Sequence, residues 1–499
     1  MTQLIYPTVD LFLYDLRDGL GQNEVDLALN RSKFLQKIDP EFDQQFKALA
    51  ALAPQDKQSK LVKYDPIASS LEKKLKEFET KENPEADFVQ LYAKQFQENP
   101  GESDLDGYYY ALQLADTYSL QVDASGSLEN PEQPRDLSQL KENQKIIISH
   151  LNHNDNDSTL EDDKLPSLGK TWLVWGQLAN NTETMEEIAK KCYQEISPNL
   201  NGKPQLQEIG ELFDVQAKVF EYWNIPRNWG QNWETFSAEN YHLIVILFPP
   251  TDQNTLSEMG KSMQSIYFDL TRLLCYRHKI IWAYWQSRRL KALMKLQSAK
   301  SKQMIDKVKN LPNEMEKMGI DLHKLELDLT QALPLLSDYA IDMKRLEVQL
   351  MTITTNLFNY QKRVEVIQNK RKGNLKLLQG DNCFYELAQK KYRKQVKSDL
   401  ASLTPELTLL ENLISTLRGI IDIENTKSEK ALNVTVGIAG MALATSGVTA
   451  TVLSTQIRPP QGNYKSINEA LGLSMGVGFI SVIICFLIVF IFRNFRHRF

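Results

Sequence analysis

Two long apolar stretches near the C-terminus constrain this chain more than any other feature. They are residues 431–453 and 470–492, and neither contains Asp, Glu, Lys or Arg. At 1.5 Å per residue, a helix of either length spans the hydrocarbon core of a bilayer, which is about 30 Å thick. The sequence therefore predicts a C-terminal transmembrane hairpin with an outward loop at 454–469 and a basic cytoplasmic tail at 493–499.

The distribution of basic residues gives the expected orientation. Three arginines lie in the tail, and Lys427 and Lys430 precede the first apolar stretch, whereas the loop has Arg458 and Lys465 against Glu469. The positive-inside rule then places both termini in the cytoplasm. We expect an integral membrane protein with a large cytosolic part.

Composition narrows the class of protein further. The four cysteines show no C-x-x-C spacing, so neither a disulfide framework nor a zinc site is indicated. The net charge of −5 argues against a general nucleic-acid-binding protein. No cofactor is predicted, and whether a divalent cation is bound or transported stays open.

The first 255 residues are typical of a mixed α/β domain. The Pro-bounded apolar run 241–248 predicts a buried strand, and Thr184 begins an expected helix. The remaining strands are expected at 9–16, 108–122, 146–151 and 171–178, and the helices at 68–79 and 184–195.

Residues 256–404 are expected to be helical and coiled-coil-like, because apolar residues recur there at intervals of three and four. The first such seam comprises Met343, Leu346, Leu350, Ile353, Leu357, Tyr360, Val364 and Ile367. A second seam comprises Leu407, Leu410, Ile414, Leu417 and Ile421. Either seam is explained by packing within one helical bundle or by oligomerisation.

The second seam leads directly toward the first apolar stretch. Pro405 suits the first position of a helix capped by Thr404, and no breaker follows before 453. A stalk helix over 405–453 would therefore continue into the membrane. The expected fold class is an α+β cytosolic domain, then a helical bundle with a long stalk helix, then a two-span C-terminal transmembrane hairpin.

The two predicted spans differ in side-chain chemistry. The second is bulky after its early glycines, as is usual for a helix that faces lipid. The first has a stripe of small and hydroxyl-bearing residues, which permits close helix packing or lines a pore. The predicted pore-lining residues are Asn433, Gly437, Gly440, Ala444, Gly447, Thr451 and Ser454.

This layout, from about residue 170 to the end, resembles the CorA family of divalent-cation transporters. The resemblance implies a homopentamer with a pore lined by the first span. In that family a Gly-Met-Asn motif ends the first span, but here the corresponding outer mouth carries Thr455, Gln456 and Arg458. We therefore expect weak cation selectivity. The resemblance extends to CorA-like effectors of prokaryotic antiviral defence systems, which implies a location in a prokaryotic plasma membrane and gating by an anionic nucleotide messenger.

Other candidate chemistry in the sequence is weak. Gly169-Lys170-Thr171 resembles the end of a P-loop, but the required upstream glycine is Lys164 and a strand-like run follows. The segment 150–163 is rich in His and Asp but lacks calcium-loop spacing, so an acidic loop is favoured. The tryptophans at 223–233 suit core packing or a ligand wall.

Basic residues gather on the predicted helices. A solvated helix face explains them, and so does binding of an anionic messenger or a ring at the pore mouth. They include Arg277, His278, Lys279, Arg288, Arg289, Lys291, Lys295, Lys300, Lys302, Lys370, Arg371, Lys372, Lys390, Lys391, Arg393 and Lys394.

The sequence thus predicts a homopentameric CorA-like ion channel that is gated by its cytosolic domain. It is not expected to be an enzyme, since no spacing of nucleophile, histidine and acid stands out. The alternative is a non-conducting, membrane-anchored coiled-coil scaffold.

Overall fold

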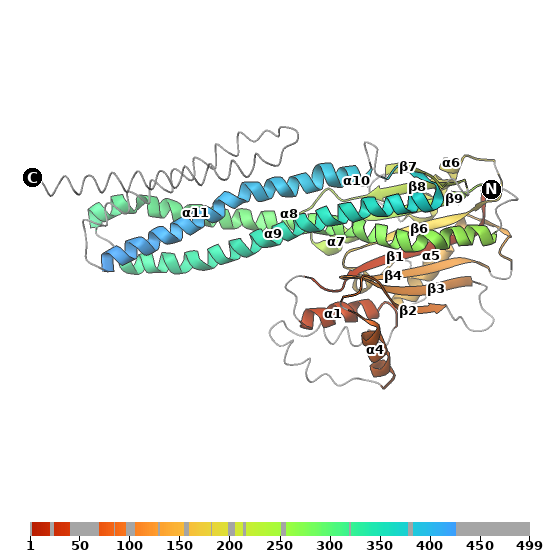
Figure 1. The fold of residues 1–499 in the computed structure, drawn as a ribbon, viewed down its shortest axis with the longest axis horizontal. Coiled ribbons are helices and arrows are strands. Elements are labelled where there is room, and N and C mark those ends of the chain that lie inside the picture. Colours follow the sequence, from red (N-terminus) through yellow and green to blue (C-terminus); the bar gives the residue numbers. More distant parts are fainter. Residues whose placement is uncertain are drawn as a thin grey trace, which may run out of the picture. The chain divides into compact units, whose positions relative to one another are not determined.

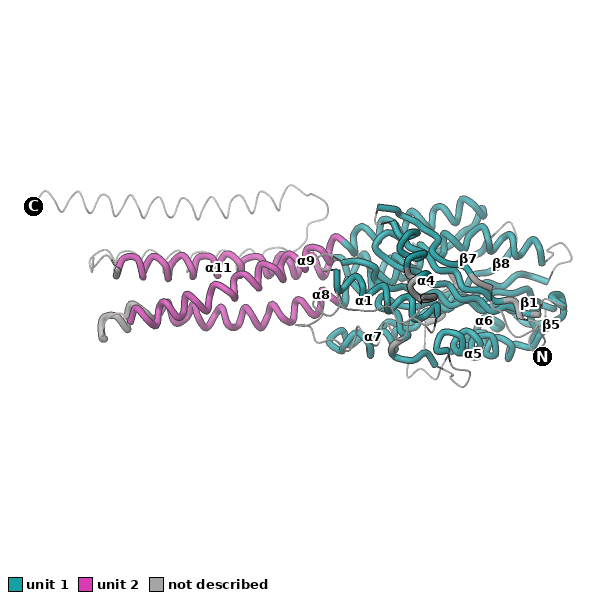
Figure 2. Tube along the Cα trace, turned by 90° about the horizontal axis from the view of Figure 1, so that it is seen from below, with its two compact units in different colours: residues 1–285, 352–393 teal, residues 286–351, 394–499 magenta. Residues whose placement is uncertain are grey.

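The computed structural model describes most of the first 425 residues and divides them into two compact units (Figures 1 and 2). Unit 1 comprises residues 1–285 and 352–393, and unit 2 comprises residues 286–351 and those from 394 on. The described residues are 2–19, 24–39, 69–83, 85–95, 105–127, 130–153, 159–180, 182–197, 205–212, 216–250, 256–318, 321–377 and 383–425.

Unit 1 is built on a ten-stranded mixed sheet. The strand order is β10-β7-β8-β9-β6-β1-β4-β3-β2, with β5 paired to β1. Strands β6 and β9 run parallel, and the other pairs are antiparallel. The strands are β1 (Gln3–Leu16), β2 (Val89–Gln95), β3 (Leu105–Leu114), β4 (Thr117–Ser127), β5 (Pro134–Asp136), β6 (Gly169–Leu178), β7 (Gln205–Leu212), β8 (Ala217–Asn224), β9 (Tyr241–Phe248) and β10 (Asn374–Leu375).

The described helices fall into a shorter and a longer group. The shorter ones are α1 (Glu24–Leu35), α4 (Ser69–Lys81), α5 (Ser138–Asn152), the 3₁₀ turn η1 (Asp162–Lys164), α6 (Met185–Ile196), α7 (Trp233–Glu239), α10 (Phe384–Leu387) and the π-helical turn η2 (Ala388–Arg393). The long ones are α8 (Leu256–Met318), α9 (Leu322–Arg371) and α11 (Lys394–Asn425).

One face of the sheet is apolar and packs on α1, α5 and α6. Alternate residues of each strand point to this face, because side chains in a strand have a period of two. They form one core with the inward residues of the three helices. Its members include Val9, Leu11, Leu13, Leu120, Val122, Val174, Val245, Leu247, Ile147, Leu151, Ile188 and Cys192.

The opposite face is also buried, but many of its side chains are polar. The first part of α8 lies against this face, where Tyr267 bonds to Asp10 of β1 and His278 bonds to Thr171 of β6. The buried polar residues of this face include Thr8, Asp10, Ser119, Gln121, Asp123, Ser125, Thr171, Glu221 and His242. The sheet therefore has an apolar face and a buried polar face, and the polar face meets α8.

Unit 2 is a three-helix coil formed by parts of α8, α9 and α11. Each helix buries a residue at every seventh position, which is the spacing of coiled-coil packing. The buried residues are Ser287, Met294, Ser301 and Val308 on α8, Leu325, Ala332, Tyr339 and Leu346 on α9, and Val396, Leu403, Leu410 and Leu417 on α11. The hydroxyl of Tyr339 donates to the carbonyl oxygen of Leu403 at 2.9 Å, which ties α9 to α11.

The two predicted heptad seams are therefore largely buried within one chain. In the first seam, Leu350 is half-buried and the other members are buried. In the second, Leu407 is half-buried and the other four are buried. The burial of the second seam, and of Met343 and Leu346 in the first, favours packing within one bundle, the first of the two explanations that the sequence left open. The first seam from Ile353 on belongs to unit 1 instead, where Tyr360 and Ile367 line a cavity together with sheet residues.

Most of the expected strands and helices are confirmed, with one clear error. Residues 171–178 and 241–248 are strands, and Thr184 caps α6 through a reciprocal hydrogen-bonded pair with Glu187. The run 108–122 is a hairpin of β3 and β4. Residues 146–151, expected as a strand, lie in α5, because a short apolar run does not distinguish a buried helix face from a strand.

The predicted two-span membrane hairpin is corrected. Among the described residues, no helix is long and apolar enough to cross a bilayer. The physical reason is that α8, α9 and α11 carry charged side chains every few residues and so lack the roughly 20 consecutive apolar residues that a span requires. The fold class with a transmembrane hairpin, the integral-membrane localisation and the description as an ion channel therefore lack structural support. Residues 431–453, 454–469, 470–492 and 493–499 lie outside the described part.

The expected stalk helix also differs from α11 at its start. Helix α11 begins at Lys394, so Pro405 lies inside it instead of at its first turn. The hydroxyl of Thr404 donates to the carbonyl oxygen of Leu400 and does not cap a helix start. The rest of the predicted stalk, from 426 to 453, is outside the described residues.

Candidate functional site

Five buried polar side chains meet where α8 packs on the sheet. Thr171 comes from β6, Glu221 from β8 and His242 from β9, while Arg277 and His278 are neighbours on α8. None of them is more than 2% exposed. We refer to these residues as the buried polar cluster, and it is the strongest candidate for a functional site in the described part of the chain.

Hydrogen bonds join four of the five residues in a continuous series. Oε1 of Glu221 lies 2.8 Å from Nε2 of His242, and Nδ1 of His242 lies 2.8 Å from Oγ1 of Thr171. The same Thr171 oxygen lies 2.8 Å from Nε2 of His278. Three strands are thereby linked to α8 through a single hydroxyl group.

The charge of Arg277 fixes the direction of these hydrogen bonds. Arginine stays protonated in proteins, and Nε of Arg277 lies 4.0 Å from Oε1 of Glu221, so an ionised Glu221 balances the charge. An ionised carboxylate accepts from Nε2–H of His242, whose Nδ1 then accepts from the Thr171 hydroxyl. The Thr171 oxygen in turn accepts from Nε2–H of His278.

The electrostatics of the cluster agree with neutral histidines. Burial, and secondly the charge of Arg277, hold the pKa of His242 and of His278 well below the usual range. Burial raises the pKa of Glu221, and the charge of Arg277 acts against that rise. Each imidazole therefore carries one proton, as the series of hydrogen bonds requires.

Arg277 itself is held in an unusual way. Its guanidinium carbon lies 4.7 Å from the centre of the Phe384 ring, which is a cation–π contact. None of its three side-chain nitrogens has a hydrogen-bond partner among the described residues, and neither does Oε2 of Glu221. Burying polar atoms without hydrogen-bond partners costs free energy. The interactions that hold Arg277 in place are therefore mainly the ion pair with Glu221 and the contact with the Phe384 ring.

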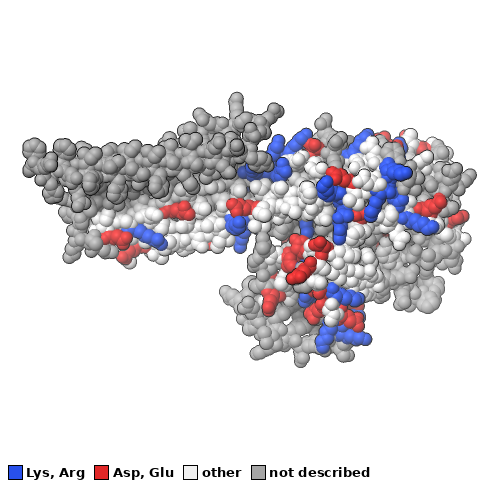
Figure 3. All heavy atoms as spheres, viewed as in Figure 1, with Lys and Arg blue, Asp and Glu red and all other residues white. Residues whose placement is uncertain are grey.

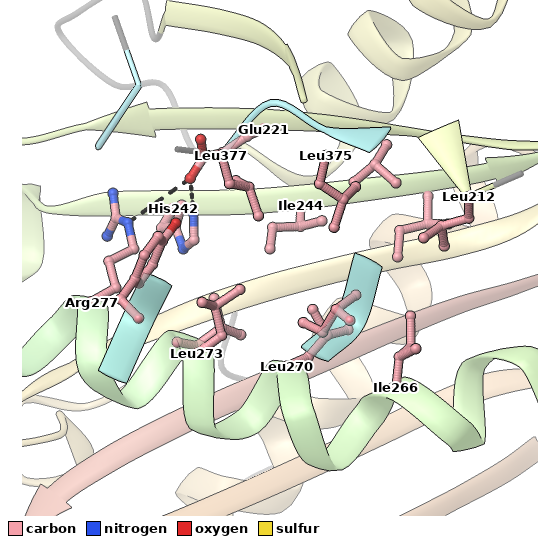
Figure 4. Close-up of a pocket in the computed structure, with 15 residues that line it drawn as sticks. Leu212, Glu221, His242, Ile244, Ile266, Leu270, Leu273, Arg277, Leu375 and Leu377 are labelled. Carbon is pink, nitrogen blue, oxygen red and sulfur yellow. Dashed lines mark hydrogen bonds and ion pairs between the residues drawn. The ribbon is translucent and has the colours of Figure 1, made fainter. Parts of the chain in front are cut away.

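A small cavity adjoins the cluster (Figure 4). Arg277, Glu221 and His242 line one end of it, and the rest is mostly aliphatic, with residues such as Ile244, Leu270 and Leu375. Its volume is about 20 Å³, measured as the space open to the centre of a water molecule. This is room for about one water and not for a metabolite.

Gly169 allows the close approach of α8 to the first residue of β6. Its φ is +147°, and a Cβ atom at this position would lie 2.3 Å from Nδ1 of His278. A side chain here would push the imidazole away from Thr171. The glycine is therefore required for the series of hydrogen bonds to reach α8.

Further polar contacts fix the same face of α8 to the sheet. The hydroxyl of Tyr267 donates to Oδ2 of Asp10 at 2.8 Å and accepts from the Trp175 indole at 2.7 Å. The hydroxyl of Tyr14 donates to the carbonyl oxygen of Thr271 at 2.9 Å. Since residues 267, 271 and 278 share one side of a helix, these contacts hold α8 in a single register.

The order of Glu221, His242 and Thr171 resembles the acid, histidine and hydroxyl of a hydrolase triad. The surroundings do not suit catalysis. Thr171 is 0% exposed, and its oxygen is already shared by two imidazoles. A nucleophile needs access to a substrate carbonyl, and the adjoining cavity is too small to admit one.

The residues that the sequence analysis assigned to the pore and to the outer mouth lie outside the described part of the chain. They are Asn433, Gly437, Gly440, Ala444, Gly447, Thr451, Ser454, Thr455, Gln456 and Arg458. Their assignment stays a prediction.

Several of the basic residues that gather on the helices are paired with carboxylates. Lys279 pairs with Asp116, both Arg288 and Lys291 pair with Asp399, and Lys370 pairs with Asp269. Lys and Arg side chains gather on the visible face of unit 1, with acidic side chains between them (Figure 3).

In the aromatic cluster at 222–236, Tyr222 and Phe236 are buried and the three tryptophans are half-buried, with two of them packed on other aromatic rings. Trp229 contacts Tyr284 and Tyr392, and Trp233 contacts Trp285. In the described part of the chain, no group of three or more His, Cys, Asp or Glu side chains could hold a metal ion.

Sequence reasoning missed the buried polar cluster, although a signal was present. His242 is a polar residue within β9, where it follows Tyr241 and precedes the apolar residues 243–248. Thr171 was considered only as the end of a P-loop. A lone polar residue within a buried strand marks a point where another element must supply a partner. The partner, His278, is more than 100 positions away from Thr171.

A comparison of the chain with family models, curated proteins and solved structures finds no significant match. The similarity to the CorA family therefore stays a prediction from the sequence. The function has to be argued from the residues of this chain.

Thr171→Val tests the buried polar cluster. It removes the hydroxyl and leaves a nitrogen of His242 and one of His278 without a partner. We expect it to lower the free energy of unfolding of unit 1 by about 2–4 kcal/mol. All seven tryptophans lie in unit 1, so tryptophan fluorescence during urea unfolding reports this unit.

Thr171→Ser keeps the hydroxyl and should cost about 1 kcal/mol or less. Equal losses in both variants would show that the hydroxyl is unimportant.

Asp10 predicts a pH dependence. Burial raises its pKa from 3.8 to about 7, against the opposing hydrogen bonds of Gln121, Tyr267 and Trp175. The folded protein thus binds this proton more tightly than the unfolded chain, so the Asp10 contribution to stability falls as pH rises from about 4 to about 7. Asp10→Asn should lose less stability across that window than the wild type in urea unfolding. Asp136→Asn, at an exposed site, should keep the wild-type profile, and a wild-type profile in Asp10→Asn would contradict the argument.

Proposed function

We propose that this protein is a non-enzymatic coupling module, in which a change at the sheet of unit 1 is carried into unit 2 by helix α8. The observation that supports this most is the continuity of α8. It is one helix of 63 residues, of which 256–285 belong to unit 1 and 286–318 to unit 2. At 1.5 Å per residue its length is roughly 95 Å.

The way in which α8 is held suits a coupling role. An apolar interface tolerates small shifts, whereas hydrogen bonds weaken steeply when distance or angle changes. The contacts of Tyr267, Thr271 and His278 with the sheet are of the second kind. A ligand or partner that disturbs the sheet would therefore release or re-engage the helix as a whole.

An anionic small molecule is the proposed input. Residues 352–393, which belong to unit 1, contain nine Lys and Arg against three Asp and Glu, and two of the nine, Arg363 and Lys370, pair with Asp269 of α8. Lys372, Lys376 and Lys391 are exposed there. This excess of positive charge supports attraction of a negatively charged ligand.

The absence of catalysis is part of the proposal. The cluster that most resembles catalytic machinery is buried, and its hydroxyl is fully engaged by His242 and His278. Ion transport is not included, because the membrane spans on which it depended are not supported by the described residues.

A second role in assembly is favoured by a separate observation. Large apolar side chains are exposed on the helices of unit 2, among them Leu296 at 65% and Ile341 at 48%. Exposed apolar groups that cluster on one element are typical of binding surfaces. The sequence analysis gave a membrane-anchored coiled-coil scaffold as its alternative. A scaffold that assembles through its helices agrees with the coiled-coil part of that alternative and does not require a membrane.

The coupling role predicts that damage to the sheet contacts of α8 is felt beyond unit 1. Tyr267→Phe removes the hydroxyl that joins Asp10 and Trp175. We expect faster amide hydrogen exchange both in 256–285 and in 286–318, because one helix is loosened along its length. Tyr110→Phe removes an exposed hydroxyl that bonds to Gln90 and should change neither segment. Faster exchange confined to 256–285 would contradict coupling through α8.

A further inference from the structure

Most of the exposed large apolar side chains in the described part of the chain belong to unit 2. Leu27 on α1 and Phe358 of unit 1 are the exceptions. The others lie on two neighbouring helices of the three-helix coil. They are Leu293 and Leu296 on α8, and Leu327, Leu333, Ile341 and Met351 on α9. The inward faces of α8 and α9 are already packed within the three-helix coil. These six side chains therefore form a second apolar surface on the outside of the two helices.

Parts of the two helices that carry this surface differ in the sign of their charge. Residues 286–310 of α8 contain eight Lys and Arg and a single acidic residue, Asp306. Residues 322–338 of α9 contain three Asp and Glu and a single lysine, Lys324. Lys300 and Lys302 are exposed on α8, and Asp338 is exposed on α9. The surface is therefore electrostatically complementary to itself.

Contacts within the chain define which residues of α8 and α9 lie at the same level. Nε2 of Gln297 donates to Oδ2 of Asp342 at 2.9 Å, and Nζ of Lys307 lies 3.6 Å from Oδ1 of Asp328. The helices are thus antiparallel. Leu296 is level with Ile341 and its neighbours, and Lys300 is level with Asp338.

We propose that this surface binds a second copy of the chain, with α8 of each copy packed on α9 of the other. A two-fold axis parallel to the helices keeps each residue at its own level. Leu293 and Leu296 of one copy then meet Ile341 of the other, and Lys300 meets Asp338. Because the interface is isologous, each contact is made twice. The proposal rests on the assembly role but not on coupling through α8.

Charge exchange at one pair tests this arrangement. Lys300→Glu places two acidic groups opposite each other in the homodimer, and Asp338→Lys places two lysines opposite each other. Each variant alone should dimerise at least about tenfold more weakly than the wild type in analytical ultracentrifugation of the full chain. An equimolar mixture of the two variants restores both ion pairs and should dimerise as the wild type does. The double variant should also recover.

An apolar variant supplies a second measurement with a matched control. Leu296→Glu should dissociate the dimer, because it buries two carboxylates in the apolar part of the interface. Leu27→Glu, at an exposed leucine of unit 1, should leave the dimer intact. Both positions are exposed, and unchanged circular dichroism verifies that the fold is kept.

Three results would overturn the proposal: a monomeric wild type, a dimer that tolerates Lys300→Glu and Leu296→Glu, or a mixture of charge variants that does not recover. None of them bears on coupling through α8, because that role is read from hydrogen exchange within one chain.

Discussion

The structure depends on how a positive charge is accommodated between α8 and the sheet. Arg277 is 1% exposed, and its Nε lies 4.0 Å from the carboxylate of Glu221 on β8. Removing either partner would leave a buried charge unbalanced, so α8 has one favourable place on the sheet. Hydrogen bonds of His242 and Thr171 connect two more strands to Glu221, and a hydrogen bond between Thr171 and His278 connects them to α8.

This arrangement explains why the sheet has two different faces. The face toward α5 and α6 is held by burial of apolar area, which favours contact but is not specific for register. The face toward α8 presents Asp10, Thr171 and Glu221, which are satisfied when particular side chains of α8 are opposite them. Apolar packing supplies most of the stability of unit 1, and the polar face determines the position of α8 on the sheet.

The sequence predicted the parts of this fold that depend on local pattern. The apolar strand 241–248, the helix that starts at Thr184 and the heptad spacing of Leu346 and Leu410 were all readable from neighbouring residues. The error at 146–151 arose because an apolar run of that length fits two kinds of element.

The buried polar cluster could not be derived, since its members become neighbours through pairing of distant strands. The heptads likewise did not show whether their partners belong to the same chain. Residues beyond 425, which carried the channel interpretation, are outside the described part.

The central claim is that the polar contacts make residues 267–279 of α8 part of the core of unit 1. Amide hydrogen exchange of the wild-type protein measures this directly, because amides of a cooperative core exchange through unfolding of the whole core. The account predicts that these amides exchange as slowly as those of β6 and β9. Exchange of residues 267–279 that is much faster than that of the two strands would show that α8 is only loosely attached, and would contradict the account.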